Sequence, residues 1–135
     1  NIVGVANWPR VVDNWPPFWR NRHMFERFYG DATNPKDRAK MLANSPVSHL
    51  ERITAPLLVV HGANDVRVLK QDSDDVVAGL KAQGRPVEAL VFANEGHSIR
   101  HWRNRLALWR KVEDHLATCL GGRNNGFDLF ELMPR

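Results

Sequence analysis

An acidic residue and a histidine stand where they could act together as a catalytic pair. Asp65 follows the apolar run 57–61, and His97 follows a second apolar run, 87–92. In an open sheet of parallel strands, catalytic groups collect beyond the carboxyl ends of the strands. A carboxylate there can hold an imidazole in one tautomer, and the imidazole can then take a proton from a hydroxyl nucleophile. We therefore interpret Asp65 and His97 as the acid and the base of a hydrolase triad.

Each of the two residues also has a structural alternative. Asp65 ends the turn sequence Gly-Ala-Asn-Asp and could simply cap that turn, while His97 could be a surface or core histidine. Their paired placement, each after a strand, favours the catalytic interpretation. His61, Asp65 and His97 are also zinc-type ligands, but their spacing does not support a closed metal site. We expect neither a metal nor an organic cofactor.

The elements that must position this pair are predicted from the pattern after Ala55. The run 57–61 is short, apolar and β-branched, which is typical of a strand covered on both faces. Residues 70–83 predict a helix with an inner stripe of Val76, Val77 and Leu80, and Val87–Phe92 reads as the next strand. This β-α-β-α order predicts parallel strands in an α/β fold.

The first residues of the chain extend this expectation to a third strand. Ile2–Ala6 is a short apolar run, and we predict that it lies beside 57–61, with Val87–Phe92 on the other side. The predicted fold class is α/β, with about three parallel strands and flanking helices. The outer edge of the first strand would then lack a partner, which is a liability in an isolated fold.

The segment between these strands combines aromatic residues with prolines. Pro9, Pro16 and Pro17 lie close together, so we expect residues 7–17 to form a loop rather than a helix interior. Its Trp8 and Trp15 either line a pocket or pack on the core. Periodicity and end signals predict three further helices and a turn. These are helices at 18–29, at about 35–43 and at 102–120, and a short linker or helical turn at 48–53.

Length and composition narrow the classes of protein to be considered. The chain has 135 residues, a net charge of +4 and a single cysteine, so it can form one modest domain without an internal disulfide. Its basic residues are scattered or lie on the amphipathic helix 102–120, so a nucleic-acid partner is not expected. No apolar run approaches the roughly 20 residues of a membrane span. We divide the chain into a domain, 1–123, and a tail, 124–135.

Several short stretches carry a resemblance to a known family. They are Ser45-Pro46, residues 53–58, residues 61–68, Val91-Phe92, Glu95-Gly96-His97 and Asn104-Arg105. On these stretches, residues 45–123 resemble the carboxyl-terminal part of the catalytic domain of the prolyl oligopeptidase family of serine peptidases. That family includes dipeptidyl peptidases and acylaminoacyl peptidases. Residues 1–44 match more loosely, as the family's sixth strand and the helical excursion after it.

The resemblance implies an α/β-hydrolase fold, a peptide substrate and a role for particular residues. Asp65 would be the triad acid and His97 the triad base. Arg67 matches a family position that holds a backbone carbonyl of the substrate; the alternative is an ordinary surface arginine. Trp8, Trp15 and Phe18 are candidates for lining the specificity pocket.

The nucleophile elbow G-x-S-x-G of this fold is not in the sequence. None of its four serines stands on a strand-to-helix turn flanked by glycines; they are Ser45, Ser48, Ser73 and Ser98. The chain therefore reads as a piece of a longer protein that lacks the amino-terminal half of its domain. We expect the isolated chain to have no peptidase activity. The alternatives are an esterase-type hydrolase, a non-catalytic assembly or binding module on the same scaffold, and a chain that is stable only as a homo-oligomer.

Overall fold

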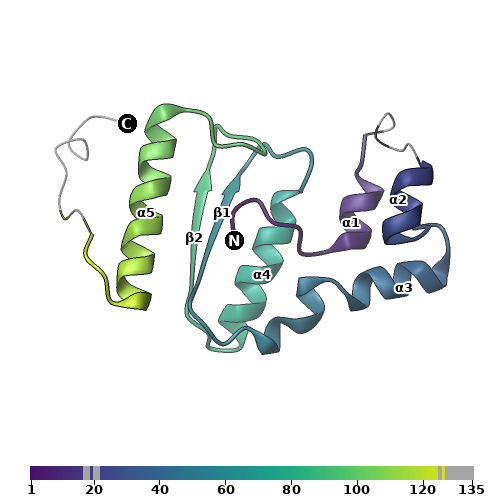
Figure 1. The fold of residues 1–135 in the computed structure, drawn as a ribbon, viewed down its shortest axis with the longest axis horizontal. Helices are drawn as coiled ribbons and strands as arrows, with labels where there is room; N and C mark the ends of the chain where they lie inside the picture. Colours follow the sequence, from purple (N-terminus) through teal and green to yellow (C-terminus); the bar gives the residue numbers. More distant parts are fainter. Residues whose placement is uncertain (17–18, 20–21, 125, 127–135) are drawn as a thin grey trace. The chain divides into compact units, whose positions relative to one another are not determined.

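The structure, a computed structural model, describes residues 1–16, 19, 22–124 and 126 (Figure 1). It divides into two units after Ser98. The first unit, Asn1–Ser98, contains all of the elements that surround Asp65 and His97. In order they are α1 (Trp8–Asp13), α2 (Arg22–Tyr29), α3 (Pro35–Ala43), the 3₁₀ helix η2 (Pro46–Arg52), β1 (Leu57–Gly62), α4 (Lys70–Ala82) and β2 (Val87–Phe92). The second unit begins at Ile99 and contains α5 (Trp102–Leu120).

The two predicted strands around α4 form a parallel sheet. β1 pairs with β2 from Leu57 opposite Val87 to Gly62 opposite Phe92, so both strands end at the same edge. Every residue of β1 after Leu57 is buried, as expected for a strand covered on both faces. The predicted β-α-β order is confirmed, and the turns that follow the two strands begin side by side.

The predicted third strand is wrong. Among the described residues the sheet has two strands, and Ile2 makes only an isolated parallel bridge with Val60. The Val3 N–H donates to the Val60 carbonyl at 2.9 Å, but Val3 itself has a φ of +46°. A β-branched residue in this left-handed region turns the chain out of the extended conformation. The run therefore lies beside β1, as expected, without continuing as a strand.

The core of the first unit lies where α4 and η2 pack near β1. Ala6, Leu50, Val59, Val76 and Leu80 form one buried cluster. Val76 and Leu80 belong to the inner stripe that the sequence predicts for α4, and both are almost completely buried. Complete burial of one such side chain stabilises a fold by roughly 1.5–3 kcal/mol. Val76 and Leu80 therefore hold α4 against the sheet.

The predicted loop at 7–17 is also wrong, because residues 8–13 form α1. Pro9 lies in the first turn of this helix, where a missing N–H costs no intrahelical hydrogen bond. Asn7 caps the helix by accepting a hydrogen bond from the Arg10 N–H at 3.1 Å. Proline excludes a helix interior but is compatible with a helix start, and Pro16 lies beyond the end of α1.

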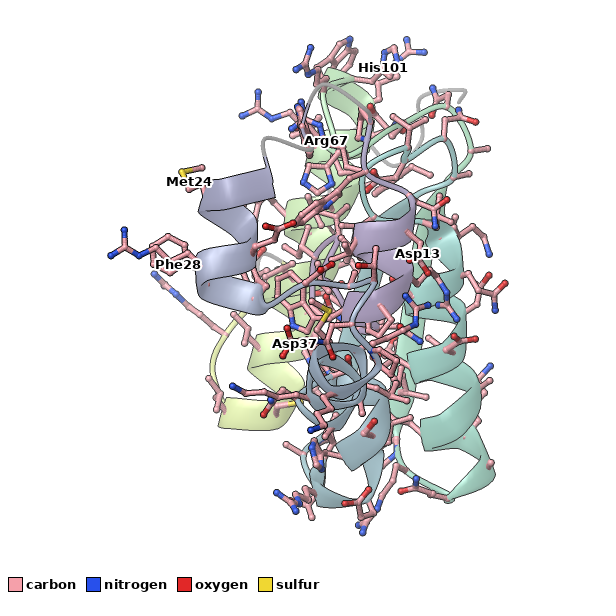
Figure 2. All side chains as sticks on the ribbon, turned by 90° about the vertical axis from the view of Figure 1, so that its right-hand side faces the viewer. Asp13, Met24, Phe28, Asp37, Arg67 and His101 are labelled. Carbon is pink, nitrogen blue, oxygen red and sulfur yellow. The ribbon has the colours of Figure 1, made fainter. Side chains whose placement is uncertain are left out.

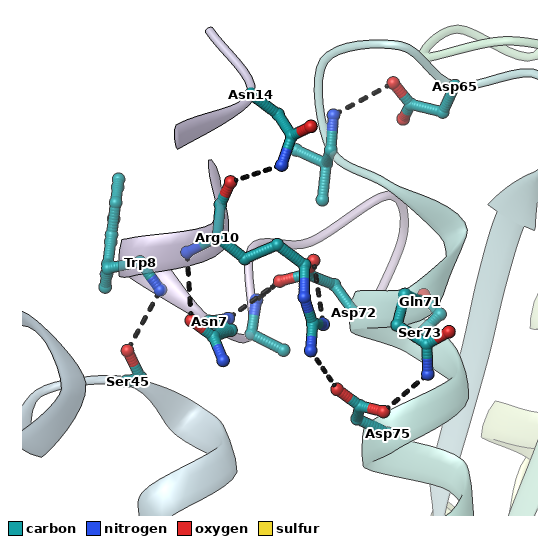
Figure 3. Close-up of polar contacts among 12 residues, drawn as sticks. Asn7, Trp8, Arg10, Asn14, Ser45, Asp65, Gln71, Asp72, Ser73 and Asp75 are labelled. Atoms are coloured by element: carbon teal, nitrogen blue, oxygen red, sulfur yellow. Dashed lines mark hydrogen bonds and ion pairs between the residues drawn. The ribbon is translucent and has the colours of Figure 1, made fainter. Parts of the chain in front are cut away.

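Helix α4 holds the start of α1 through a buried carboxylate, Asp72, and a partly exposed one, Asp75 (Figure 3). The Asp72 carboxylate, completely buried, accepts hydrogen bonds from the N–H groups of Ala6 at 2.9 Å and Asn7 at 2.7 Å. Arg10 on α1 reaches both Asp72, at 3.3 Å, and Asp75, at 2.6 Å. Because Asp72 satisfies two backbone donors and an arginine at once, it ties the amino-terminal segment to α4.

Helices α2 and α3 lie at predicted places in the sequence. Asn34 caps α3, Pro35 is its first residue, and the helix ends at Ala43 as expected. Helix α2 lies within the predicted helix 18–29 but begins only at Arg22, while Phe18 lies outside the described residues. Met24 and Phe28 of α2 point away from the rest of the unit and are highly exposed (Figure 2).

Helix α5, in the second unit, has the bounds that the sequence predicts. Gly121 follows it with a φ of +70°, which is the left-handed cap that glycine favours. Trp102, Leu106 and Trp109 are exposed and Leu108 is buried. Within the described residues, the helices are too short or too polar to cross a membrane. Most of the predicted tail 124–135 lies outside the described residues.

Candidate active site

The turn after β1 encloses the carboxylate of Asp65. This residue is 4% exposed. Its Oδ1 accepts hydrogen bonds from the N–H groups of Arg67 at 2.8 Å and Val68 at 3.0 Å. The structural alternative considered for Asp65, a turn cap, is therefore real, but it uses only one of the two carboxylate oxygens. The other oxygen, Oδ2, remains available to a partner from a different segment.

That partner is His97. The Nδ1 atom of His97 lies 2.8 Å from Oδ2 of Asp65, although the two residues are 32 positions apart. The imidazole is about one third exposed, while the carboxylate side chain is completely buried. Because a buried carboxylate accepts here, Nδ1 carries the proton and Nε2 is the basic nitrogen. This is the arrangement that a triad acid and base require.

The backbone brings these two loops together. The Ala63 N–H donates to the Phe92 carbonyl at 2.9 Å, and the Asn64 N–H donates to the Glu95 carbonyl at 2.9 Å. The Asn64 side chain adds a hydrogen bond to the Ala93 carbonyl at 2.9 Å. The turn after β1 is thus bonded to the turn after β2 residue by residue, which sets the approach of His97 to Asp65.

Gly62 allows this close approach. A Cβ atom at position 62 would lie 2.1 Å from the Gly96 carbonyl oxygen and 2.6 Å from that of Glu95. Both are backbone atoms, which cannot move aside as a flexible side chain can. The glycine at the end of β1 is therefore required by the contact between the two turns and not by an unusual backbone angle.

His61 is a part of this site that sequence reasoning considered only as a zinc ligand. It is completely buried at the end of β1. Its Nδ1 lies 2.7 Å from the Ser73 hydroxyl, and its Nε2 lies 2.9 Å from the Val68 carbonyl and 3.5 Å from Oδ2 of Asp65. In the sequence, the only indication of this role was that His61 stands four residues before Asp65. Within the described part of the chain, no group of His, Cys, Asp and Glu side chains is arranged to hold a metal ion.

The candidate substrate-binding residues Arg67, Trp8 and Trp15 have different described contacts. Arg67 is exposed two residues after Asp65, and its guanidinium lies over the Trp19 ring at 5.1 Å. Trp8 instead stacks on Tyr29, with ring centroids 4.7 Å apart. Trp15 follows α1 and donates its backbone N–H to the Val12 carbonyl at 3.4 Å. Among the described residues, Trp19 thus contacts Arg67, a pairing that the sequence did not predict, and the pocket-lining role of Trp8 and Trp15 stays a prediction.

An open groove of about 600 Å³ lies between α1 and α3, away from the Asp65–His97 pair. Arg10, Asp13, Pro35, Arg38 and Leu42 are among its lining residues. Arg38 and Asp13 are joined there by two hydrogen bonds, at 2.9 and 2.6 Å. Because Arg38 and Asp13 are paired with each other, we do not consider this groove further as a candidate site.

Comparison with known proteins shows which proteins this chain is similar to. Residues 3–123 match the model of the prolyl oligopeptidase family. The chain is 32% identical over 129 residues to dipeptidyl peptidase family member 6 of Caenorhabditis elegans, covering 94% of this chain and 17% of the relative. It is 34% identical over 126 residues to dipeptidyl aminopeptidase BIII of Pseudoxanthomonas mexicana, covering 91% of this chain and 18% of the relative. The chain therefore spans less than a fifth of the length of these relatives.

A solved structure shows the same fold. The acylaminoacyl peptidase of Pyrococcus horikoshii superposes on 97% of this chain, and on 21% of its own length, with a TM-score of 0.75 and 23% identity. The chain thus has the fold of part of an α/β-hydrolase domain.

Proposed function

The chain belongs to the prolyl oligopeptidase family, and from that premise we propose that it forms the carboxyl-terminal part of the catalytic domain of a serine peptidase. The proposed activity is of the dipeptidyl or acylaminoacyl peptidase kind. One observation carries the proposal: buried Asp65 lies 2.8 Å from Nδ1 of His97, at the carboxyl ends of two parallel strands. Asp65 is the acid and His97 the base of the triad.

In the proposed mechanism, Asp65 and His97 each have a separate role. Asp65 holds the Nδ1–H of His97, so Nε2 can accept the proton of a serine hydroxyl as the oxygen attacks the peptide carbonyl. The imidazolium then gives that proton to the leaving amine, and a water molecule completes the cycle through the same base. The buried carboxylate stabilises the imidazolium without becoming protonated.

The nucleophile is proposed to come from a segment of the intact protein outside this sequence. The four serines of the chain are Ser45, Ser48, Ser73 and Ser98. The first three donate hydrogen bonds to, respectively, the Met41 carbonyl at 2.8 Å, the Leu42 carbonyl at 2.7 Å and the His61 ring at 2.7 Å. Ser98 directly follows His97 in the chain. A partner segment carrying G-x-S-x-G would complete the triad.

Arg67 is proposed to bind the substrate. A guanidinium is a permanent cation with five donors, which suits a backbone carbonyl next to the bond that is cleaved. Its contact with Trp19 supports this role, because the ring holds the charged group in place. Removing the side chain should raise KM more than it lowers kcat.

The test uses the intact protein on dipeptidyl-amide and acylaminoacyl-amide substrates. Wild type should hydrolyse one of these classes, and Asp65→Asn should lower kcat by about 10⁴-fold because the imidazole loses its tautomer. His97→Ala should have an effect of similar size. Asp74→Asn is the matched control, since Asp74 is an exposed acid paired with Lys70 at 2.5 Å. Hydrolysis of short esters but not amides would favour an esterase, and no labelling by a serine-reactive phosphonate would favour a binding module.

A further inference from the structure

Both ring nitrogens of His61 form hydrogen bonds, although the residue is completely buried. Nδ1 lies 2.7 Å from the Ser73 hydroxyl on α4, and Nε2 lies 2.9 Å from the Val68 carbonyl. A carbonyl can only accept, so Nε2 carries the proton and donates it. Nδ1 must then accept, and the Ser73 hydroxyl is the donor. In a neutral imidazole the Val68 carbonyl thus selects the Nε2–H tautomer, and the Ser73 hydroxyl satisfies the other ring nitrogen.

This tautomer closes the turn that holds Asp65. The Val68 carbonyl is bonded to His61, and the N–H of the same residue is bonded to Oδ1 of Asp65 at 3.0 Å. Val68 is thus held on both sides, by the histidine at the start of the turn and by the acid in its middle. The Nε2–H of His61 also faces Oδ2 of Asp65 at 3.5 Å, the oxygen that binds His97. Two imidazoles approach one carboxylate oxygen from different segments.

Ser73, His61 and Asp65 contain the residue types of a triad, but they cannot act as one. Ser73 is 3% exposed and His61 has no exposure, so a substrate cannot reach the hydroxyl. The carboxylate contacts the ring only at 3.5 Å, through the nitrogen that already donates to the Val68 carbonyl. A fully satisfied buried network of this kind rigidifies its surroundings.

We propose that His61 and Ser73 are positioning residues for the Asp65–His97 pair. Ser73 donates to Nδ1 of His61 and orients the ring, and His61 donates through Nε2 to the Val68 carbonyl, which holds the turn 65–68 so that Oδ2 of Asp65 points at His97. This inference rests on the proposed function for its catalytic consequence, but its structural half concerns only this chain. The two halves are therefore tested by separate measurements.

The structural half is tested by nitrogen-15 NMR of the imidazoles in the 135-residue chain at mildly alkaline pH. Wild type should show His61 protonated at Nε2 and His97 protonated at Nδ1. His61→Leu keeps the bulk but removes the donor, so the Nδ1 proton of His97 should exchange with water about 10-fold faster, equivalent to an easier opening of the turn. His61→Gln places an amide donor where Nε2 was and should restore slow exchange.

Ser73→Ala is the milder variant if His61→Leu does not fold. Without the hydroxyl, Nδ1 of His61 loses its donor while Nε2 still faces the Val68 carbonyl, so the ring should be held less firmly and the Nδ1 proton of His97 should again exchange faster. Unchanged exchange at His97 would overturn the proposal. So would fast exchange in His61→Gln equal to that in His61→Leu.

The catalytic half is tested in the intact protein, with kcat expressed per active site titrated by a phosphonate. His61→Leu should lower this kcat by about 10- to 100-fold with little change in KM, as expected for a small displacement of the base. His61→Gln should stay close to wild type. A purely structural role would reduce the number of titratable sites and leave kcat per site unchanged, which would overturn the positioning role. If wild type itself hydrolyses no amide, the proposed function fails, and the NMR result still decides the inference.

Discussion

At the scale of single residues, one carboxylate does two things that the sequence presented as alternatives. Oδ1 of Asp65 caps its own turn, and Oδ2 binds His97. The cap immobilises the carboxylate, and an immobile carboxylate is what an imidazole needs in order to keep one tautomer. The local turn chemistry therefore supports the catalytic role that we propose for this carboxylate.

A prediction at this scale concerns Gly62. Gly62→Ala places a methyl group against the carbonyl oxygens of Gly96 and Glu95, so the two turns must separate. We expect a loss of about 1–3 kcal/mol in the free energy of unfolding, which is typical of overpacking. Chemical denaturation of the chain measures it, and hydrogen exchange of the Asn64 amide reports the separation.

Gly96→Ala is the matched control for this change. The nearest atom to its added Cβ, the Asn64 carbonyl oxygen, is 3.6 Å away, an ordinary contact. A loss in Gly96→Ala as large as that in Gly62→Ala would show that any alanine in these turns is harmful and that close approach at position 62 is not the cause.

At the scale of elements, α4 connects the core to the amino-terminal segment. Its Val76 and Leu80 enter the buried cluster, and its Asp72 binds the Ala6 and Asn7 N–H groups that precede α1. The segment that begins beside β1 is thus turned away from the sheet and held on the helix. This explains why the apolar run Ile2–Ala6 does not become a full strand.

Asp72→Ala should destabilise the chain by about 3 kcal/mol. The change leaves two backbone N–H groups without their acceptor and removes one of the two carboxylates that Arg10 contacts. Asp74→Ala, two residues along the same helix, removes an exposed pair with Lys70 and should cost no more than about 0.5 kcal/mol. Urea unfolding of the two variants gives the comparison, and equal losses would argue against the anchoring role of Asp72.

At the scale of the whole molecule, the chain holds two of the three groups that the proposed mechanism needs. Its sheet has two strands over the described residues, and the relatives are more than five times as long. The proposed partners follow from this. They are the amino-terminal half of the domain, which would supply the nucleophile, and a peptide substrate, with a second copy of the chain as the alternative partner.

The isolated chain is therefore predicted to be inactive. Without a serine in position to attack, no acyl-enzyme forms, so a serine-reactive phosphonate should not label the 135-residue chain, whereas it should label the intact protein. Mass spectrometry after labelling makes the comparison. A stoichiometric adduct on any serine of the isolated chain would contradict the prediction, and its position would identify the nucleophile.

The homo-oligomer alternative makes a separate prediction about the mass of the chain in solution. Light scattering at low micromolar concentration tests whether the chain pairs with a second copy. A monomer would remove the homo-oligomer alternative, whereas a dimer would support it.

The sequence by itself determined the elements whose signals are local. The run 57–61 is apolar on both faces, α4 has a helical stripe, and Asn34-Pro35 is a helix start, so each appears where it was predicted. The placement of Asp65 and His97 after two parallel strands followed from the same local patterns. Local patterns were misleading where one residue type is compatible with two conformations. Pro9 excludes a helix interior but lies in the first turn of α1. The run Ile2–Ala6 is apolar like a strand, but the positive φ of Val3 is not that of a strand.

Only the tertiary structure decided which side chains meet. The contact of Arg67 with Trp19 and the close contact of Gly62 with Gly96 join segments that are distant in sequence. The burial of His61 depends on how α4, which carries Ser73, packs beside β1. The physical reason is that such contacts depend on how elements pack, while the pattern of residues within an element determines only its own conformation.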